Sequence, residues 1–545
     1  MIDSSTDRSQ PLVEQVPVLV VGAGLAGLST AMFLGMHGIT SLVVERHATT
    51  ATHPKARGQM PTVMEAFRVA GIDDAVRRAG YDTSLPMEIV IGPSLLGTPY
   101  KTLVESFDFD LTSISPTGMG MASQEAVEPI LADRAGAWGA RVQFRTELDG
   151  FTVDDEGVTA ELIDLQTGGR RTVRADYLVG ADGWRTTTRG AVGIGAHGHG
   201  ALSHWVNTIF RADLGAPMEG REFALVYLQN PELQGGTGVF GGTDEPGRYV
   251  LSFAFDPEQG EQFSDFTEAD CIEQIRIGIG DLDLEVELLD RAETEFAHRL
   301  ADSYVAGRVV LAGDAAHVMP PTGGQGGNTA VLDGFDLGWK LAMIIKGEAG
   351  PGLLASYDVE RRAFGEWIAE YQYQNLLQRM TPGGAEKDGG EAGRDPLDLM
   401  FGSRVVDGAV CPEPDDDHEL VEHVVTADSR PGSRAQHVWL QRDGEQISTR
   451  DLFGRSFVIL AADPAWRQAA GQVSDQLGVP LDVQVVGGDD LVDPAAQFAA
   501  RYGVGEDGAS LVRPDGFVAW RTEGAADPAA LADAVRRVLS LSTVG

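Results

Sequence analysis

A glycine-rich turn near the start of the chain joins an apolar strand to an apolar helix. The strand Val18–Val21 leads into Gly22-Ala23-Gly24-Leu25-Ala26-Gly27, a helix is expected from Leu28 to Met36, and a second strand, Ser41–Val44, ends at Glu45. This order is that of a dinucleotide-binding βαβ unit, in which glycines admit a pyrophosphate to the helix N-terminus and an acid binds the ribose. The candidate cofactor residues here are Gly22, Gly24, Leu25, Ala26, Gly27 and Glu45.

A glycine-rich turn in an ordinary α/β domain, or a membrane span, would give part of the same pattern. The stretch Val18–Leu34 contains several glycines and is soon followed by polar residues, which is unlike a span. The complete strand, turn, helix, strand and acid together favour the dinucleotide site.

A second glycine-rich loop follows another apolar strand, Arg308–Ala312. The strand runs into Gly313-Asp314, and a helix is expected from Asn328 to Ile345. Asp314 at the strand end can accept hydrogen bonds from a polyol. The four glycines between positions 323 and 327 let backbone N–H groups approach a flat ligand. The positive helix N-terminus suits a ligand that must carry negative charge, as a reduced flavin ring does.

A third element, the strand from Asp176 to Ala181, is followed by Asp182-Gly183 and the cationic Arg185. With the three motifs in this order, the chain resembles the single-component class A flavoprotein aromatic hydroxylases, which have the para-hydroxybenzoate hydroxylase fold. The resemblance implies that Asp182 and Gly183 assist FAD and NAD(P)H binding and that Asp314 contacts the FAD ribityl chain. It further implies flavin or FAD contacts at Arg46, Arg57, Gln124, Gly313, Pro321, Gly327 and Asn328.

The activity implied by the resemblance is that of an FAD-dependent, NAD(P)H-consuming monooxygenase. FAD would be bound tightly but not covalently. NADPH or NADH would bind transiently, since there is no second G-x-G-x-x-G motif. A flavin hydroperoxide formed with dioxygen would hydroxylate a phenolic ring, and the size and C-terminal region resemble enzymes that act on polycyclic aromatic polyketides.

Other classes of protein differ in specific features. A flavin-dependent halogenase would need a W-x-W motif, yet no two tryptophans are two residues apart. An ordinary NAD-dependent dehydrogenase would leave Gly313-Asp314 unexplained. A Baeyer–Villiger oxygenase on the same fold and a non-catalytic FAD-binding protein both remain open.

The expected fold class is α/β, with a Rossmann-type FAD-binding domain (1–80, 119–199 and 301–380) and an inserted antiparallel-sheet substrate domain (81–118 and 200–300). Alternating apolar and polar residues at Asn207–Ala212, Glu222–Leu228 and Arg248–Phe255 predict the strands of the inserted sheet. Ser123 is expected to cap a helix that runs through Ala137, and Asp493–Tyr502 is expected to be a helix in the C-terminal region. Residues 381–435, rich in Gly, Asp, Glu and Pro, are expected to form a linker with little core. Residues 436–545 resemble the thioredoxin-like C-terminal domain of phenol and polyketide hydroxylases. This region holds no cysteine, so we expect a structural role or a dimerising one, the latter giving a homodimer.

Composition limits the partners and the compartment. The net charge of −39 argues against nucleic acid or an anionic membrane as a partner. The only cysteines, Cys271 and Cys411, are far apart in the sequence, so neither a disulfide scaffold nor a metal site is expected. Residues 1–15 lack the apolar region of a signal peptide, which favours a cytoplasmic enzyme.

No catalytic side chain can be assigned from spacing alone. His317 follows the Gly-Asp motif, and we expect a structural role for it rather than that of a base. Four side chains have the chemistry to orient or deprotonate the substrate, although packing or surface exposure accounts for each more simply: His204, Arg221, Tyr227 and Tyr249.

Overall fold

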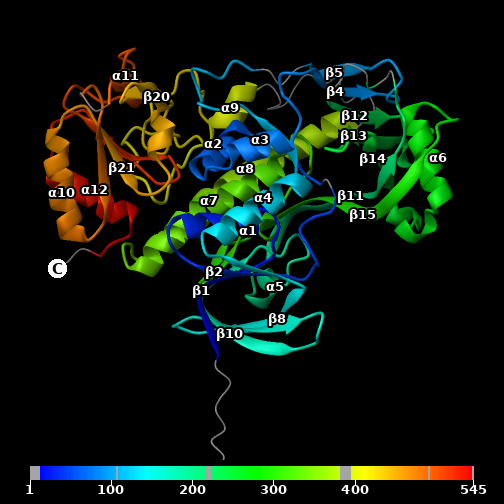
Figure 1. The fold of residues 1–545 in the computed structure, drawn as a ribbon, viewed down its shortest axis with the longest axis horizontal. Coiled ribbons are helices and arrows are strands. Elements are labelled where there is room, and N and C mark those ends of the chain that lie inside the picture. Colours follow the sequence, from blue (N-terminus) through cyan, green and yellow to red (C-terminus); the bar gives the residue numbers. More distant parts are fainter. Residues whose placement is uncertain are drawn as a thin grey trace, which may run out of the picture.

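The computed structural model describes residues 13–53, 55–105, 109–215, 218, 223–380, 394–488 and 491–542. Figure 1 shows a large sheet with helix α6 (Glu268–Ile279) at one end of the molecule and a smaller α/β body, containing the C-terminus, at the other. Between them lies a central body around the long helices α7 (Gln325–Lys346) and α8 (Leu353–Met380).

The central sheet has the strand order β16-β17-β10-β1-β2-β7, and its strands from β17 to β7 are parallel. The bounds of these strands are β1 Glu14–Val21, β2 Ser41–Glu45, β7 Arg141–Phe144, β10 Arg170–Gly180, β16 Val305–Ala306 and β17 Val309–Leu311. Strand β9 (Val158–Asp164) pairs antiparallel with β10, and β8 (Thr146–Val153) pairs antiparallel with β9. They form the small lobe at the bottom of Figure 1.

Helix α1 (Leu25–Met36) is apolar on every face, and it is buried on almost all sides, as is typical of such a helix. It packs against α4 (Gln124–Ala137) and α7. A Cβ atom on Gly334 of α7 would lie 2.6 Å from the Thr30 nitrogen, so glycine is needed for the two helices to approach this closely. As expected, Ser123 caps α4, and its side chain accepts a hydrogen bond from the Ala126 N–H at 3.3 Å.

The second sheet has the order β18-β15-β11-β14-β13-β12-β4-β5. Its strands are β4 Met87–Gly92, β5 Lys101–Val104, β11 Ala196–Arg211, β12 Phe223–Gln229, β13 Thr237–Gly242, β14 Arg248–Phe255, β15 Glu287–Ala301 and β18 His317–Val318. An antiparallel sheet is expected from the sequence, but β4 pairs with β12 in parallel. The reason is topological: β4 comes from a distant part of the chain and not from a hairpin. Strands β11 and β15 are far longer than the sequence pattern predicts, and through β18 they reach the Gly-Asp loop of the central body.

Short elements complete the central body. They are β3 (Arg57–Gln59), which pairs with β6 (Gly120–Ser123), and the helices α2 (Pro61–Val69), α3 (Asp73–Ala79) and α5 (Thr188–Ala191). The pair β3–β6 joins the βαβ unit to the start of α4, so it places the loop after β2 beside the second sheet.

The C-terminal body contains a sheet of order β22-β21-β23-β24, made of β21 (Phe457–Ala461), β22 (Leu481–Val485), β23 (Ala509–Val512) and β24 (Val518–Thr522). Its helices are α10 (Ala465–Leu477), α11 (Phe498–Tyr502) and α12 (Pro528–Val538), and a hairpin of β19 (Trp439–Arg442) and β20 (Glu445–Ser448) precedes them. The helix expected from Asp493 begins only at Phe498, because the Asp493 carboxylate accepts hydrogen bonds from the backbone N–H groups of Ala495 and Phe498.

The described part of the expected linker, residues 394–435, is not a loose connection with little core. It begins with helix α9 (Pro396–Phe401), and Phe401, Ala409 and Val410 are buried. Ala409 and its neighbours are packed because the segment lies between the central and C-terminal bodies, where the Ala409 N–H donates to Glu360 on α8. The expectation of little core is therefore wrong for these residues, since composition alone does not reveal such contacts.

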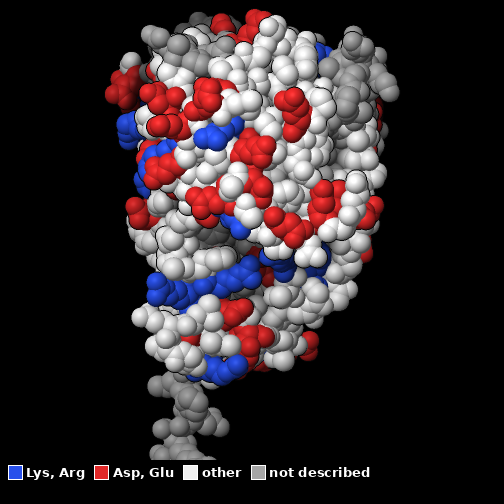
Figure 2. Space-filling model, turned by 90° about the vertical axis from the view of Figure 1, so that its right-hand side faces the viewer, with Lys and Arg blue, Asp and Glu red and all other residues white. Residues whose placement is uncertain are grey.

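The acidic charge is not spread evenly over the surface. Figure 2 shows a band of Lys and Arg side chains across one face, just above the small lobe, while acidic side chains are scattered over the rest of that face. In the part of the chain described, no helix has the length and apolar character needed to cross a membrane.

Candidate cofactor and substrate site

The three sequence motifs meet at one edge of the central sheet. They follow the carboxyl ends of the neighbouring parallel strands β1, β10 and β17. The Ala181 N–H donates to the Val21 carbonyl at 2.8 Å, and the Ala312 N–H donates to the Gly180 carbonyl at 3.0 Å. In open α/β sheets, ligands bind in the crevice at such carboxyl ends.

The three glycines of the first motif have different steric environments. A Cβ on Gly22 would lie 2.2 Å from the Ala181 carbonyl oxygen, and a Cβ on Gly27 would lie 1.9 Å from the Gly22 oxygen. Both glycines are therefore required by the protein itself. A Cβ on Gly24 would have only Glu128 Oε1 nearby, at 3.7 Å, so this position leaves open space for a ligand at the start of α1.

The acid that closes β2 lies beside this turn. Glu45 Oε2 accepts the Ala23 N–H at 2.9 Å, and Oε1 accepts the His47 N–H at 2.8 Å. The carboxylate is thus held at the glycine turn and remains half-buried. The side chain of Arg46 is exposed.

The Gly-Asp loop packs directly against the first motif. Gly313 has a positive φ of 60°, and a Cβ there would lie 2.7 Å from the Ala26 Cβ. Asp314 is exposed to solvent, although protein atoms surround its carboxyl closely. The surrounding protein raises the pKa of its carboxyl by desolvation, and the positive charges of His317 and Lys55 oppose this shift.

A buried carboxylate on α7 holds the Gly-Asp loop in place. Asp333 Oδ2 accepts the Gly313 N–H at 2.9 Å and lies 2.6 Å from His317 Nε2, while Oδ1 accepts Arg361 Nε at 2.8 Å. Burial alone would raise the pKa of Asp333, but His317 and Arg361 reverse the effect and lower it. These contacts agree with the structural role expected for His317. Sequence reasoning missed Asp333, although an acid within an apolar helix is a detectable signal.

Helix α7 begins three residues before the expected start, at Gln325, after Gly323 and Gly324 at positive φ. In a helix that begins there, the N–H of Gly327 is still free, whereas that of Asn328 is the first to bond within the helix. The Asn328 side chain accepts the Met60 N–H at 2.7 Å and donates to the carbonyls of Gly58 and Gly324. Asn328 therefore ties the helix to β3, and the backbone donor role expected for it passes to earlier residues of the loop. Pro321, in the same loop, is exposed.

The Asp-Gly motif forms a cap for α5. Asp182 Oδ2 accepts the N–H groups of Thr187 at 2.8 Å and Thr188 at 3.0 Å, and Gly183 takes a positive φ of 77°. The exposed Arg185 lies over the Trp184 ring at 4.3 Å. The motif thus shapes the loop that borders the Gly22 turn.

Arg57, expected to meet the FAD pyrophosphate, and Gln124, expected to contact FAD, both have partners within the protein. Gln124 Nε2 donates to Glu128 Oε1 at 2.6 Å on the same helix. Arg57 forms an ion pair with Asp244 of the second sheet, and its guanidinium lies 4.8 Å from the Tyr81 ring centre. This arrangement does not support a pyrophosphate contact for Arg57. The Arg57 guanidinium pairs with Asp244 because two chain segments far apart in the sequence meet at this point.

On the second sheet, Tyr227 is buried and its hydroxyl accepts Arg379 Nη1 from the end of α8 at 3.0 Å. Nothing in the sequence indicated Arg379. Tyr249 packs against the rings of Phe210 and Phe240, and burial raises the pKa of its phenol. His204 contacts the Phe255 ring, and Arg221 lies outside the described residues.

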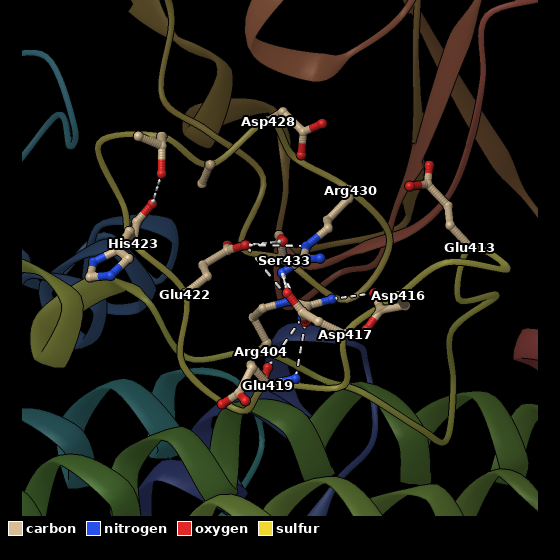
Figure 3. A network of polar contacts seen from close by, with 12 residues as sticks. Arg404, Glu413, Asp416, Asp417, Glu419, Glu422, His423, Asp428, Arg430 and Ser433 are labelled. Carbon is tan, nitrogen blue, oxygen red and sulfur yellow. Dashed lines mark hydrogen bonds and ion pairs between the residues drawn. The ribbon is translucent and has the colours of Figure 1, made fainter. Parts of the chain in front are cut away.

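Two hollows lie away from these motifs. One, of about 840 Å³, is lined by residues around Arg211, Leu214 and Glu287 at the end of the second sheet. The other, of about 650 Å³, lies in the segment shown in Figure 3. There Asp417 pairs with Arg404 at 2.8 Å and with Arg430 at 2.9 Å.

A glycine turn open only at Gly24, an acid beside it and an accessible Asp314 in the turn after β17 are the features of a flavin-adenine dinucleotide site, and this site adjoins a large second sheet. Residues 15–371 match the family described as FAD binding domain, and residues 428–541 match the C-terminal region of aromatic-ring hydroxylases. The chain belongs to the FAD-dependent aromatic-ring hydroxylases.

Several relatives match along the whole chain. An aklavinone 12-hydroxylase of Streptomyces purpurascens is 44% identical over 96% of this chain and 99% of its own. A 4-methyl-5-nitrocatechol 5-monooxygenase of a Burkholderia species is 39% identical over 96% of this chain and 98% of its own. The crystal structure of an aklavinone-11 hydroxylase in a ternary complex with FAD and aklavinone has a TM-score of 0.90 and 43% identity, covering 97% of this chain and 99% of that one.

Proposed function

We propose that this enzyme hydroxylates a phenolic ring of a polycyclic aromatic polyketide, with NADPH or NADH as the reductant and dioxygen as the co-substrate. The observation that carries the proposal is the similarity to the aklavinone hydroxylases, which extends through the second sheet as well as the cofactor domain. The catechol monooxygenase of similar identity makes a single-ring substrate the competing possibility.

The residues present fit FAD. Gly24 and the N-terminus of α1 would hold the pyrophosphate, Glu45 the ribose, and Asp314 the ribityl chain, while the free N–H groups at the start of α7 would face the flavin ring. FAD, when bound, supplies hydride acceptance from the nicotinamide and the activation of dioxygen.

The protein's own task is to orient the ring and to favour its phenolate. A cation beside a phenol stabilises the ionised form. Arg379 and Tyr227 are the charged and hydroxyl-bearing pair we assign to this task, because Arg379 lies on the helix that also contacts the Gly-Asp loop and Tyr227 lies on the second sheet. Replacement of Arg379 by Met should raise KM for the phenolic substrate and shift the pH dependence of kcat/KM upward, while the FAD content stays unchanged.

We also propose a division into an FAD-binding domain (1–80, 119–199 and 301–380), a substrate domain (81–118 and 200–300) and a thioredoxin-like C-terminal domain (436–545). Support for the last comes from its βαβ order followed by an antiparallel hairpin and a final helix. We expect it to serve structure or dimerisation.

The test is NADPH and NADH oxidation by the purified holoenzyme with a panel of anthracyclinone-type polycyclic phenols and single-ring catechols. Mass spectrometry and NMR of the product would show a new ring hydroxyl. Coupled turnover with polycyclic phenols supports the proposal. Coupled turnover only with catechols refutes the polyketide substrate while preserving the hydroxylase.

A further inference from the structure

Three side chains from three different elements meet on the outer side of β15. They are His199 on β11, His298 on β15 and Glu370 on α8, and their donor atoms all lie within 4.8 Å of one another. Glu370 Oε2 is 3.0 Å from His199 Nε2 and 3.8 Å from His298 Nε2. Two imidazoles and one carboxylate are the ligand types that borderline divalent cations such as Zn²⁺ take in open sites.

The backbone is shaped to bring these groups together. The pairing of β11 with β15 is interrupted between His197 and Gly200, where Gly198 and Gly200 take positive φ angles of 123° and 78°. A Cβ on Gly198 would lie 2.6 Å from His298 Nδ1, so only glycine fits there. A bulge of this kind re-aims a side chain, and here it turns the His199 ring outward toward α8.

His298 has a buried nitrogen without a partner. The residue is only 4% exposed, and its Nε2, which is aimed at Glu370, makes no hydrogen bond. Buried polar atoms in proteins almost always have a hydrogen-bond partner, so this one needs an explanation. The His199 ring stacks on Tyr373 with centroids 4.0 Å apart and an angle of 20°, which holds its nitrogen beside the same carboxylate.

We propose that His199, His298 and Glu370 bind a divalent transition-metal ion, with Zn²⁺ as the best match, and leave its outer position to water. His298 Nδ1 accepts the His199 N–H at 3.2 Å, so the metal-free ring carries its proton on Nε2. Metal binding moves that proton to Nδ1 and breaks this contact.

The ion would fasten the second sheet to α8. Two residues beyond Glu370, the Gln372 carbonyl accepts the Thr322 hydroxyl at 2.7 Å, and Thr322 belongs to the loop after the Gly-Asp motif. Glu370 therefore lies on the part of α8 that also holds the loop after the Gly-Asp motif. None of its three ligands belongs to the cofactor motifs, so the site is separate from the FAD site.

The test uses the tag-free holoenzyme, cleared of metal and titrated with ZnSO₄ by calorimetry. We expect one Zn²⁺ per chain, retained after dialysis. The Zn K-edge X-ray absorption should show imidazole ligands at about 2.0–2.1 Å. Replacing His298 by Ala or Glu370 by Gln should weaken binding at least tenfold and abolish the rise in Tm caused by Zn²⁺.

His423→Ala is the matched control, because His423 also pairs with a carboxylate, Asp398, but stands outside the cluster. The control should bind Zn²⁺ as the parent does. If the parent retains no Zn²⁺, or if Glu370→Gln retains as much as the parent, the proposal is wrong. If His298→Ala does not fold, the conservative Glu370→Gln variant still decides.

Discussion

Asp333→Asn removes one negative charge from the carboxylate that holds the Gly-Asp loop, with almost no change in volume. Asp333 is fully buried and bonds to Gly313, His317 and Arg361. The amide can still accept one hydrogen bond, but the Arg361 guanidinium loses its ionic partner. Removing one member of a buried ion pair typically costs about 3–5 kcal/mol, because the remaining charge is left uncompensated.

This cost converts into measurable changes. Unfolding entropy near 2.1 cal/mol/K per residue gives roughly 1.1 kcal/mol/K for the chain, so Tm should fall by about 3–5 °C if the chain unfolds as one unit. The Gly313 hydrogen bond is worth about 1 kcal/mol, and its loss from the cofactor loop should weaken FAD binding by about fivefold.

Calorimetry of the apoprotein and fluorescence titration with FAD measure the two effects separately. Asp133→Asn, an exposed change of the same charge on α4, is the control and should leave both unchanged. A Tm for Asp333→Asn equal to that of the control would show that the buried network does not stabilise the loop. Equal FAD affinity in Asp333→Asn and Asp133→Asn would show that the geometry of the Gly-Asp loop does not depend on the Asp333 carboxylate.

Four further substitutions test other parts of the structure. Gly24→Ala should preserve the Tm of the apoprotein but abolish FAD retention, whereas Gly27→Ala should not fold stably; full flavin occupancy in Gly24→Ala would contradict the site. Burial lowers the pKa of His437 to about 4, so on acidification the unfolded chain takes up a proton below about pH 6.5 while the folded chain does not until about pH 4. The free energy of unfolding should therefore fall by up to ~3 kcal/mol between these two pH values. In His437→Gln, the free energies of unfolding measured with urea at pH 4.5 and at pH 7 should differ by less than they do in the parent. Arg513→Met removes the buried cation that pairs with Asp515 and leaves Glu360 with Lys340 as its cation. This should lower the free energy of unfolding by about 3–5 kcal/mol, so an unchanged urea midpoint would argue against this contact between the central and C-terminal bodies.

Much of the cofactor site could be predicted because its signals are local. The turn at Gly22 and the cap at Ser123 depend on residues a few positions apart, and the structure has both where the sequence placed them. The start of α7 was misplaced by three residues, because glycines at its first turn hid the helical pattern. The partner of Arg57 could not be predicted, since Asp244 lies in a distant hairpin.

The sequence by itself determined the βαβ unit, the order of the three motifs and the alternation of strands and helices in the C-terminal region, because backbone conformation and apolar periodicity are set by neighbouring residues. Tertiary structure alone decided which charges are paired. The contacts of Asp333 with Arg361, of Arg513 with Glu360 and of His298 with Glu370 join segments of chain whose meeting no local pattern encodes. The energetics of burying a charge act only after the fold has brought those segments together, so these residues can be assigned only from the folded molecule.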